Sequence, residues 1–95
     1  MRALLPGDLD MAVRALLNVP PEARAELANL LLQEAQAADL YRRKYGKPHV
    51  NFGSGTLASA ASTRRLAPLP DHCTAAYCDA LALFLEVYLA RKSSL

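Results

Sequence analysis

The chain has 95 residues, 53% of them hydrophobic, and a formal net charge of +2. This apolar fraction excludes a disordered tail. The length predicts a single domain over residues 1–95. Alanine and leucine dominate the composition, and because both favour helix, we expect this domain to be helical. The longest apolar stretch, residues 80–90, contains Glu86 and is much shorter than the ~20 residues of a membrane span.

The N-terminal segment does not have the form of an export signal. Its apolar run over residues 3–5 is interrupted at once by Pro6 and Gly7, whereas an export signal needs roughly 7–15 apolar residues. We therefore expect a cytoplasmic protein without membrane contact, in which Cys73 and Cys78 are free thiols. On one helix, two residues five positions apart point about 140° away from each other, which disfavours a disulfide between them.

Two helices are predicted in the first half of the chain. The first runs from Asp8, a suitable N-cap, to Leu17, and the prolines at 20 and 21 end it. The second runs from Pro21 to Tyr45, and Gly46 is its C-terminal cap. Its predicted buried stripe follows three-and-four spacing. The stripe consists of Leu27, Leu30, Leu31, Ala35, Ala38, Tyr41 and Tyr45.

Two further helices are predicted in the second half. A short one starts at Thr56, whose hydroxyl can cap it, and ends near Arg64. The last one is capped by Asp71 and runs to about Arg91; it is apolar almost all round, so it is central in the fold or partly covered by another chain. No segment has a period of two. The predicted fold class is all-α: a small bundle of three longer helices and one short helix.

The segment "YGKPHVNFGSGTLASA" (residues 45–60) between the second and third helices contains the only Gly-x-Gly. Glycines before a helix start are typical of anion-binding loops, but the Walker pattern and a preceding strand are both missing. We favour a structural interpretation, in which Gly53 and Gly55 form turns, Phe52 fills the core and Thr56 caps the next helix. His49 could bind a ligand together with Asn51, but we expect it to satisfy a backbone carbonyl or to cap a helix end.

The charges of the chain are unevenly distributed. Residues 1–40 carry a net charge of −3, whereas residues 41–65 contain six bases and no acid. This basic segment can contact nucleic-acid phosphates. It can equally be a solvated helix end that complements the helix dipole. The linker between its two helices is too long for a helix-turn-helix, so reading of base sequence is not expected. The candidate binding residues for a partner or an anion are Arg42, Arg43, Lys44, Lys47, His49, Asn51, Gly53, Ser54, Gly55, Thr56, Arg64 and Arg65.

We find no catalytic or metal-binding pattern in the sequence. Cys73 is a candidate reactive thiol, because it follows His72 in the predicted first turn of the last helix, where the helix dipole lowers the pKa of a thiol; a small buried side chain is the favoured alternative. The spacing of the histidines and cysteines matches no common zinc site. The acids of the first two helices are expected mostly on exposed faces, whereas Glu34 and Glu86, on largely apolar faces, are expected to be partly buried and to meet an arginine. We therefore expect no enzymatic activity, no cofactor and no bound metal.

Three stretches of the chain carry a resemblance to a known family. These are "LPGDLDMAVRALLNVP", "AADLYRRKYGKPHVNFGSGTL" and the final apolar helix. Together they make the chain similar to a family of short, uncharacterised helical proteins of alphaproteobacteria, some of which lie in phage-like gene clusters of the gene-transfer-agent type. The resemblance implies a bacterial cytoplasmic protein linked to particle assembly or DNA packaging, and it supplies no catalytic residue.

These observations favour a small helical protein-interaction domain, an adaptor or assembly factor. It would hold a protein partner or a second copy of itself through the last helix or through the loop of residues 45–56. The alternative is a nucleic-acid-associated protein that contacts phosphates through the basic segment.

Overall fold

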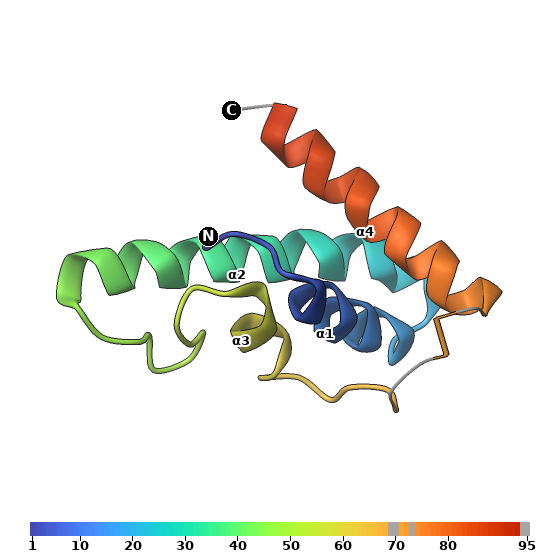
Figure 1. Ribbon diagram of the computed structural model, residues 1–95, viewed down its shortest axis with the longest axis horizontal. Helices are drawn as coiled ribbons and strands as arrows, with labels where there is room; N and C mark the ends of the chain where they lie inside the picture. The colour runs from blue at the N-terminus through green and yellow to red at the C-terminus, as the bar shows by residue number, and fades with distance from the viewer. Residues whose placement is uncertain (69–70, 73, 94–95) are drawn as a thin grey trace.

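The computed structural model describes residues 1–68, 71–72 and 74–93. These residues form α1 (Pro6–Leu17), a 3₁₀ turn η1 (Pro21–Ala23), α2 (Arg24–Tyr45), α3 (Leu57–Ala61) and α4 (Ala75–Ser93), and no strand (Figure 1). The predicted all-α bundle with three longer helices and one short helix is confirmed. Among the described residues, none of the helices combines the length and the apolarity needed to cross a bilayer.

Helix α1 begins two residues earlier than predicted. Pro6 is its first residue, a position where the missing N–H of proline is not needed. Asp8 therefore lies inside the first turn and is buried, against the expectation of an exposed cap. Its Oδ2 accepts the Leu5 N–H at 2.8 Å, and its Oδ1 accepts the Ala58 N–H of α3 at 3.0 Å. One carboxylate thus satisfies donors at the starts of two helices and ties α1 to α3.

Helix α2 is the longest element, at 22 residues. The prolines at its start produce η1 instead of the first α-helical turn, so the predicted start at Pro21 was three residues early. Gly46 ends the helix as predicted, with a φ of 71° and its N–H donating to the Arg42 carbonyl at 2.8 Å.

The predicted buried stripe of α2 was partly wrong. Leu31, Ala35 and Ala38 are buried as expected, but Leu30 and Tyr45 are exposed, and Ala28, Leu32 and Asp39 are buried instead. The reason is that α3 and α4 both pack on α2, which shifts the buried face away from the stripe that leucine spacing alone suggests.

Helix α3 is a short connector. The Thr56 hydroxyl accepts the Ser59 N–H at 3.1 Å, which confirms Thr56 as the cap. The helix ends at Ala61, before the predicted end near Arg64, and the chain then runs along α1. There the Ala67 N–H donates to the Arg14 carbonyl at 3.0 Å, and Arg14 Nε donates to the Ala67 carbonyl at 2.8 Å.

Helix α4 begins at Ala75, four residues after the predicted cap at Asp71. The Thr74 hydroxyl accepts the Tyr77 N–H at 3.3 Å, so Thr74 serves the first turn instead. The helix crosses α2, and its C-terminal half stands away from the body of the molecule (Figure 1). Only Tyr77, Ala80 and Phe84 of α4 are buried, and Glu86 is exposed, contrary to the expectation of partial burial.

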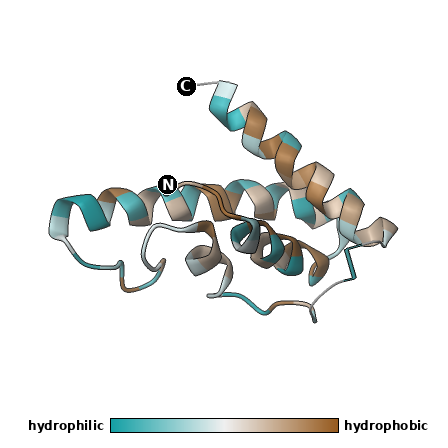
Figure 2. Ribbon diagram, in the orientation of Figure 1, coloured by the Kyte–Doolittle hydropathy of each residue, from teal (hydrophilic) through white to brown (hydrophobic). Residues whose placement is uncertain are grey.

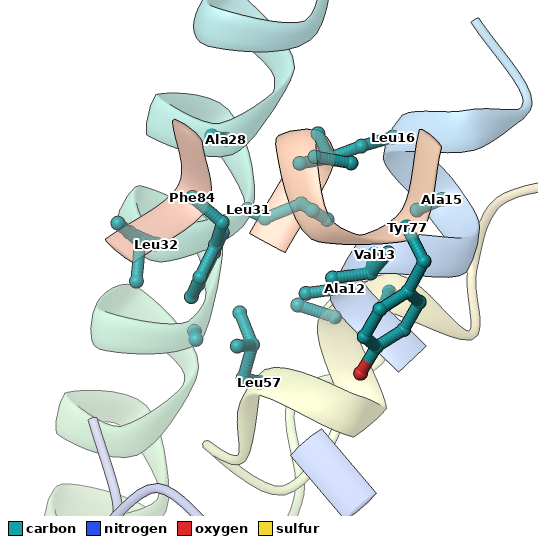
Figure 3. Packing of buried hydrophobic residues seen from close by; sticks show 14 residues of the cluster. Ala12, Val13, Ala15, Leu16, Ala28, Leu31, Leu32, Leu57, Tyr77 and Phe84 are labelled. Atoms are coloured by element: carbon teal, nitrogen blue, oxygen red, sulfur yellow. The ribbon is translucent and has the colours of Figure 1, made fainter. Parts of the chain in front are cut away.

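The core lies where α1, α2, α3 and α4 meet. Phe84 lies close to Leu32 of α2, and Tyr77 lies beside Val13 of α1 (Figure 3). Leu16, Leu31 and Leu57 complete the centre of the cluster. At about 25 cal/mol per Å² of apolar surface, burial of such a side chain contributes roughly 1.5–3 kcal/mol. The first half of α4 is therefore held firmly against the body, whereas its second half contacts the core only through the partly buried Val87 and Tyr88.

Candidate functional site

A buried carboxylate organises the C-terminal end of α2. The Asp39 side chain is 1% exposed, and it lies 2.8 Å from Arg42 Nη2, 3.0 Å from Arg43 Nη2 and 3.2 Å from the Met1 amino group. The hydrogen bond from Arg42 lowers the pKa of Asp39 below its ordinary value, although burial acts in the opposite direction. Asp39 thus stays ionised and positions both arginines. The burial of Asp39 contradicts the expectation that the acids of α2 are exposed. The sequence did contain a signal for its ion pairs, since Asp39 precedes Arg42 by three residues and Arg43 by four.

The loop that follows α2 packs closely against the backbone of Asp39. A Cβ on Gly55 would be 2.7 Å from Asp39 Cα, and a Cβ on Gly53 would be 2.6 Å from Ser59 Cβ. Both glycines have positive φ, 94° and 84°, which confirms the predicted turn conformations. The Ser54 and Thr56 hydroxyls both hydrogen-bond Ser59, at 3.0 and 2.9 Å. The Gly-x-Gly pattern therefore reflects close packing of the loop on α2 and α3.

The tip of the loop is a closed turn around His49. The His49 and Gly53 backbones exchange hydrogen bonds of 2.8 and 3.1 Å, and His49 Nδ1 accepts the N–H groups of Asn51 and Phe52 at 3.0 and 3.1 Å. The expectation that His49 serves a carbonyl or a helix end was wrong, because the imidazole accepts donors of its own turn. Phe52 stacks on His49 at a ring distance of 4.7 Å and lies outside the buried core, so its predicted core position was also wrong. Val50 is 91% exposed at the tip.

The structure divides the predicted basic segment into two parts. Arg42, Arg43, Lys44 and Lys47 lie together at the end of α2, with Lys44 Nζ 5.3 Å from the centre of the Tyr45 ring. Arg64 and Arg65 lie elsewhere, after α3. The Arg64 guanidinium forms a two-point ion pair with Glu34, at 2.8 and 2.6 Å, about two turns before Arg42 on α2. This pair confirms the prediction that Glu34 meets an arginine.

The contact of the N-terminal segment with the loop was not predicted from the sequence. The Arg2 N–H donates to the Gly55 carbonyl at 3.0 Å, and Met1 also donates to the Gln36 side chain. The N-terminal arm (residues 1–5) therefore lies along α2 beside the loop, as Figure 1 shows. No local pattern in the sequence marks this contact, since it joins residues 53 positions apart.

A second surface lies on the outward side of α4. Figure 2 shows hydrophobic residues along most of the helix, including part of the half that stands away from the body, whereas its last turn is hydrophilic. Five exposed residues follow one another at steps of three and four, the spacing of a helix-pairing seam. This outer stripe consists of Ala75, Cys78, Ala82, Leu85 and Leu89. Leu89 is 59% exposed, and the exposed acids Asp79 and Glu86 line one edge of the stripe.

A third group of polar residues joins α1 to the start of α4. Asp10 Oδ1 accepts the Tyr77 hydroxyl at 2.7 Å and lies 3.2 Å from His72 Nε2. The hydrogen bond to Asp10, together with burial, raises the pKa of Tyr77 to about 12. Cys78 is a free, exposed thiol, and its Sγ lies 3.7 Å from the His72 carbonyl. The reactive-thiol candidate Cys73 lies outside the described residues, and within those residues no group of three metal-ligating side chains is present.

Residues 2–88 match the model of the DUF7742 family, described as a domain of unknown function. The chain belongs to this family. No curated protein and no solved structure matches it. In this DUF7742 protein the matched region contains Arg2, the end of α2 with its loop, and most of the outer stripe; Leu89 lies one residue beyond it.

Proposed function

We propose that this DUF7742 protein is a helical interaction domain, an adaptor or assembly factor, which binds a partner helix along the outer stripe of α4. The observation that carries the proposal is the exposure of Leu85 and Leu89 on a helix whose opposite face is already buried in the core. A helix with one face in its own core and a second apolar face in solvent is the arrangement expected where another chain covers it.

The charges beside the stripe indicate the chemistry of the partner. Asp79 and Glu86 are seven residues apart on the same edge of the stripe. A partner helix complementary to this surface has apolar residues at three-and-four spacing and Lys or Arg along the edge that faces these acids. Pairing with a second copy is less favourable in either direction. A parallel pair brings Lys92 beside Lys92 of the other copy, and an antiparallel pair places the two acidic edges on the same side.

The biological process is proposed from the resemblance to alphaproteobacterial proteins of gene-transfer-agent-type clusters. A small adaptor that holds one helix of a larger component suits the assembly of a phage-like particle or its DNA-packaging machinery, where many subunits must be joined in order.

The test is recovery of the partner from the native host with tagged wild type and with the double variant Leu85→Glu, Leu89→Glu. We expect at least a tenfold loss of the co-purified partner, because burying a charge at the centre of an interface costs about 2 kcal/mol or more. The matched control is Leu40→Glu, which adds the same charge at an exposed leucine of α2 and should leave recovery unchanged. A partner that binds the double variant as well as wild type, or a strictly monomeric protein that recovers no partner, would contradict the proposal.

A second candidate function is contact with nucleic-acid phosphates through the basic central segment. The observation that favours it is the exposure of Arg43, Lys44 and Lys47 at one end of the molecule. This surface lies at the C-terminal end of α2, and it shares no residue with the outer stripe.

A further inference from the structure

The N-terminal arm and the C-terminal part of α2 together carry more positive charge than the sequence suggests. Four bases of this region are exposed: Arg2 on the arm, and Arg43, Lys44 and Lys47 at the end of α2. The only acid in residues 35–57 is Asp39, which is buried. We propose that these four side chains form one binding surface for the phosphate backbone of a nucleic acid, to which the N-terminal arm contributes. The inference rests on the second candidate function and is independent of the outer stripe.

A continuous series of contacts places Arg2 in this surface. Its N–H is bonded to the Gly55 carbonyl, and Gly55 lies against the Asp39 backbone at van der Waals distance. Asp39 in turn holds Arg43, whose side chain is still 64% exposed. The backbone of Arg2 and the guanidinium of Arg43 are therefore connected through one buried residue, Asp39, although 41 positions separate them in the sequence.

Two other arginines of the basic segment, Arg42 and Arg64, have internal partners, whereas Arg65 is exposed after α3. Arg42 directs a guanidinium N–H at Asp39, and its side chain is two-thirds covered. Arg64 uses both terminal nitrogens on Glu34, and its Nη1 also contacts the Ala60 carbonyl. Glu34 compensates the charge of Arg64, and Arg42 is the more covered of the two arginines that share Asp39, so these two act within the fold. Arg43 also contacts Asp39 but keeps most of its side chain in solvent, so it can face the ligand together with Arg2, Lys44 and Lys47.

Phosphate backbone is the ligand class that fits these groups. A duplex presents one negative charge per about 1.7 Å of its axis, and cations without a base-reading helix can contact that charge without sequence preference. The exposed Tyr45 ring beside Lys44 adds a flat surface on which a sugar or an unpaired base can pack.

The test is fluorescence anisotropy of the full chain with a labelled 20-base-pair duplex of random sequence between 50 and 200 mM salt. Four phosphate contacts predict a slope of log affinity against log salt of about −3.6, which is a loss on the order of a hundredfold over this range. Arg2→Gln, Lys44→Gln and Lys47→Gln should each reduce the magnitude of the slope by about 1. The matched controls Arg64→Gln and Lys92→Gln should leave it unchanged, and circular dichroism verifies the fold of each variant.

Three results would overturn the inference. The first is duplex binding that is absent or insensitive to salt, and the second is an Arg2→Gln variant with the wild-type slope, which would remove the arm from the surface. The third is tighter binding of poly-glutamate than of duplex or single-stranded DNA, which would assign the surface to an acidic protein. The Leu85→Glu, Leu89→Glu variant should bind the duplex with the wild-type slope, so a failure of this inference is distinguishable from a failure of the proposed interaction at α4.

Discussion

Replacing Gly55 by alanine tests the packing that holds the loop on α2. The new Cβ would lie 2.7 Å from Asp39 Cα, a backbone atom that cannot rotate away, and Gly55 has a φ of 94°. The left-handed backbone costs an L-residue roughly 1–2 kcal/mol, and overpacking costs about 1–3 kcal/mol more. We therefore expect a loss of roughly 2–5 kcal/mol in the free energy of unfolding, a large part of the total for a domain of this size.

Two other glycines serve as matched controls for these two effects. Gly46 has a φ of 71° but nothing within 4 Å of its would-be Cβ, so Gly46→Ala carries the backbone strain alone, roughly 1–2 kcal/mol. Gly7 has free space and lies in the first turn of α1, so Gly7→Ala should be neutral or stabilising by up to about 1 kcal/mol.

Urea denaturation followed by circular dichroism measures the three variants beside wild type. The expected order of stability is Gly7→Ala, then Gly46→Ala, then Gly55→Ala. A Gly55→Ala variant as stable as Gly46→Ala would refute the close approach of the loop to α2, and with it the path of contacts that places Arg2 beside the end of α2.

Three further predictions concern the ion pairs and the buried tyrosine. Asp39→Asn should lower stability at pH 7 by about 2–4 kcal/mol, since it leaves the partly covered Met1 amino group and Arg42 without their buried carboxylate. Because the folded-state pKa of Asp39 is lowered, the difference from wild type should be present above pH ~4 and should shrink as the pH falls further. An equal deficit in urea melts at pH 7 and pH 3 would contradict this. The phenolate absorbance of wild type minus that of Tyr77→Phe should give a midpoint near 12. Because that pKa is raised, the stabilisation by Tyr77 is complete below pH ~10 and is lost as the pH rises towards 12; a midpoint near 10 would show that the bond to Asp10 does not form. A double-mutant cycle of Glu34→Gln with Arg64→Gln should give a coupling of about 1–2 kcal/mol, and a coupling near zero would mean that the pair is not formed in solution.

Local signals in the sequence were sufficient for the helices but not for their exact faces. Gly46 and Thr56 were identified as caps because capping depends on the residue and its immediate neighbours. The start of α1 was misplaced because Asp8 caps from inside the first turn, a geometry in which the acid also serves Ala58 of α3. The buried face of α2 depends on two partner helices, which no spacing rule within α2 contains.

The candidate site was predictable in composition but not in arrangement. The run of bases at residues 42–44 marked one end of the surface, whereas Arg2 joins it only through a backbone hydrogen bond to Gly55. Arg64 was included among the candidate binding residues because it is close to the loop in sequence. Its ion pair with Glu34 shows that it acts within the fold instead. The outer stripe of α4 was visible only as an all-round apolar helix, since which side of it faces the core depends on the position of Phe84.

Site-specific photo-cross-linking in the native host tests the proposed interaction at α4 most directly. A photoreactive phenylalanine derivative replaces Leu89 in the outer stripe, and a control protein carries it at Gln33, an exposed position on α2. We predict one discrete cross-linked partner from position 89 that is missing from position 33 and is lost when Leu85→Glu is added. No cross-link from position 89, or the same products from both positions, would contradict the account.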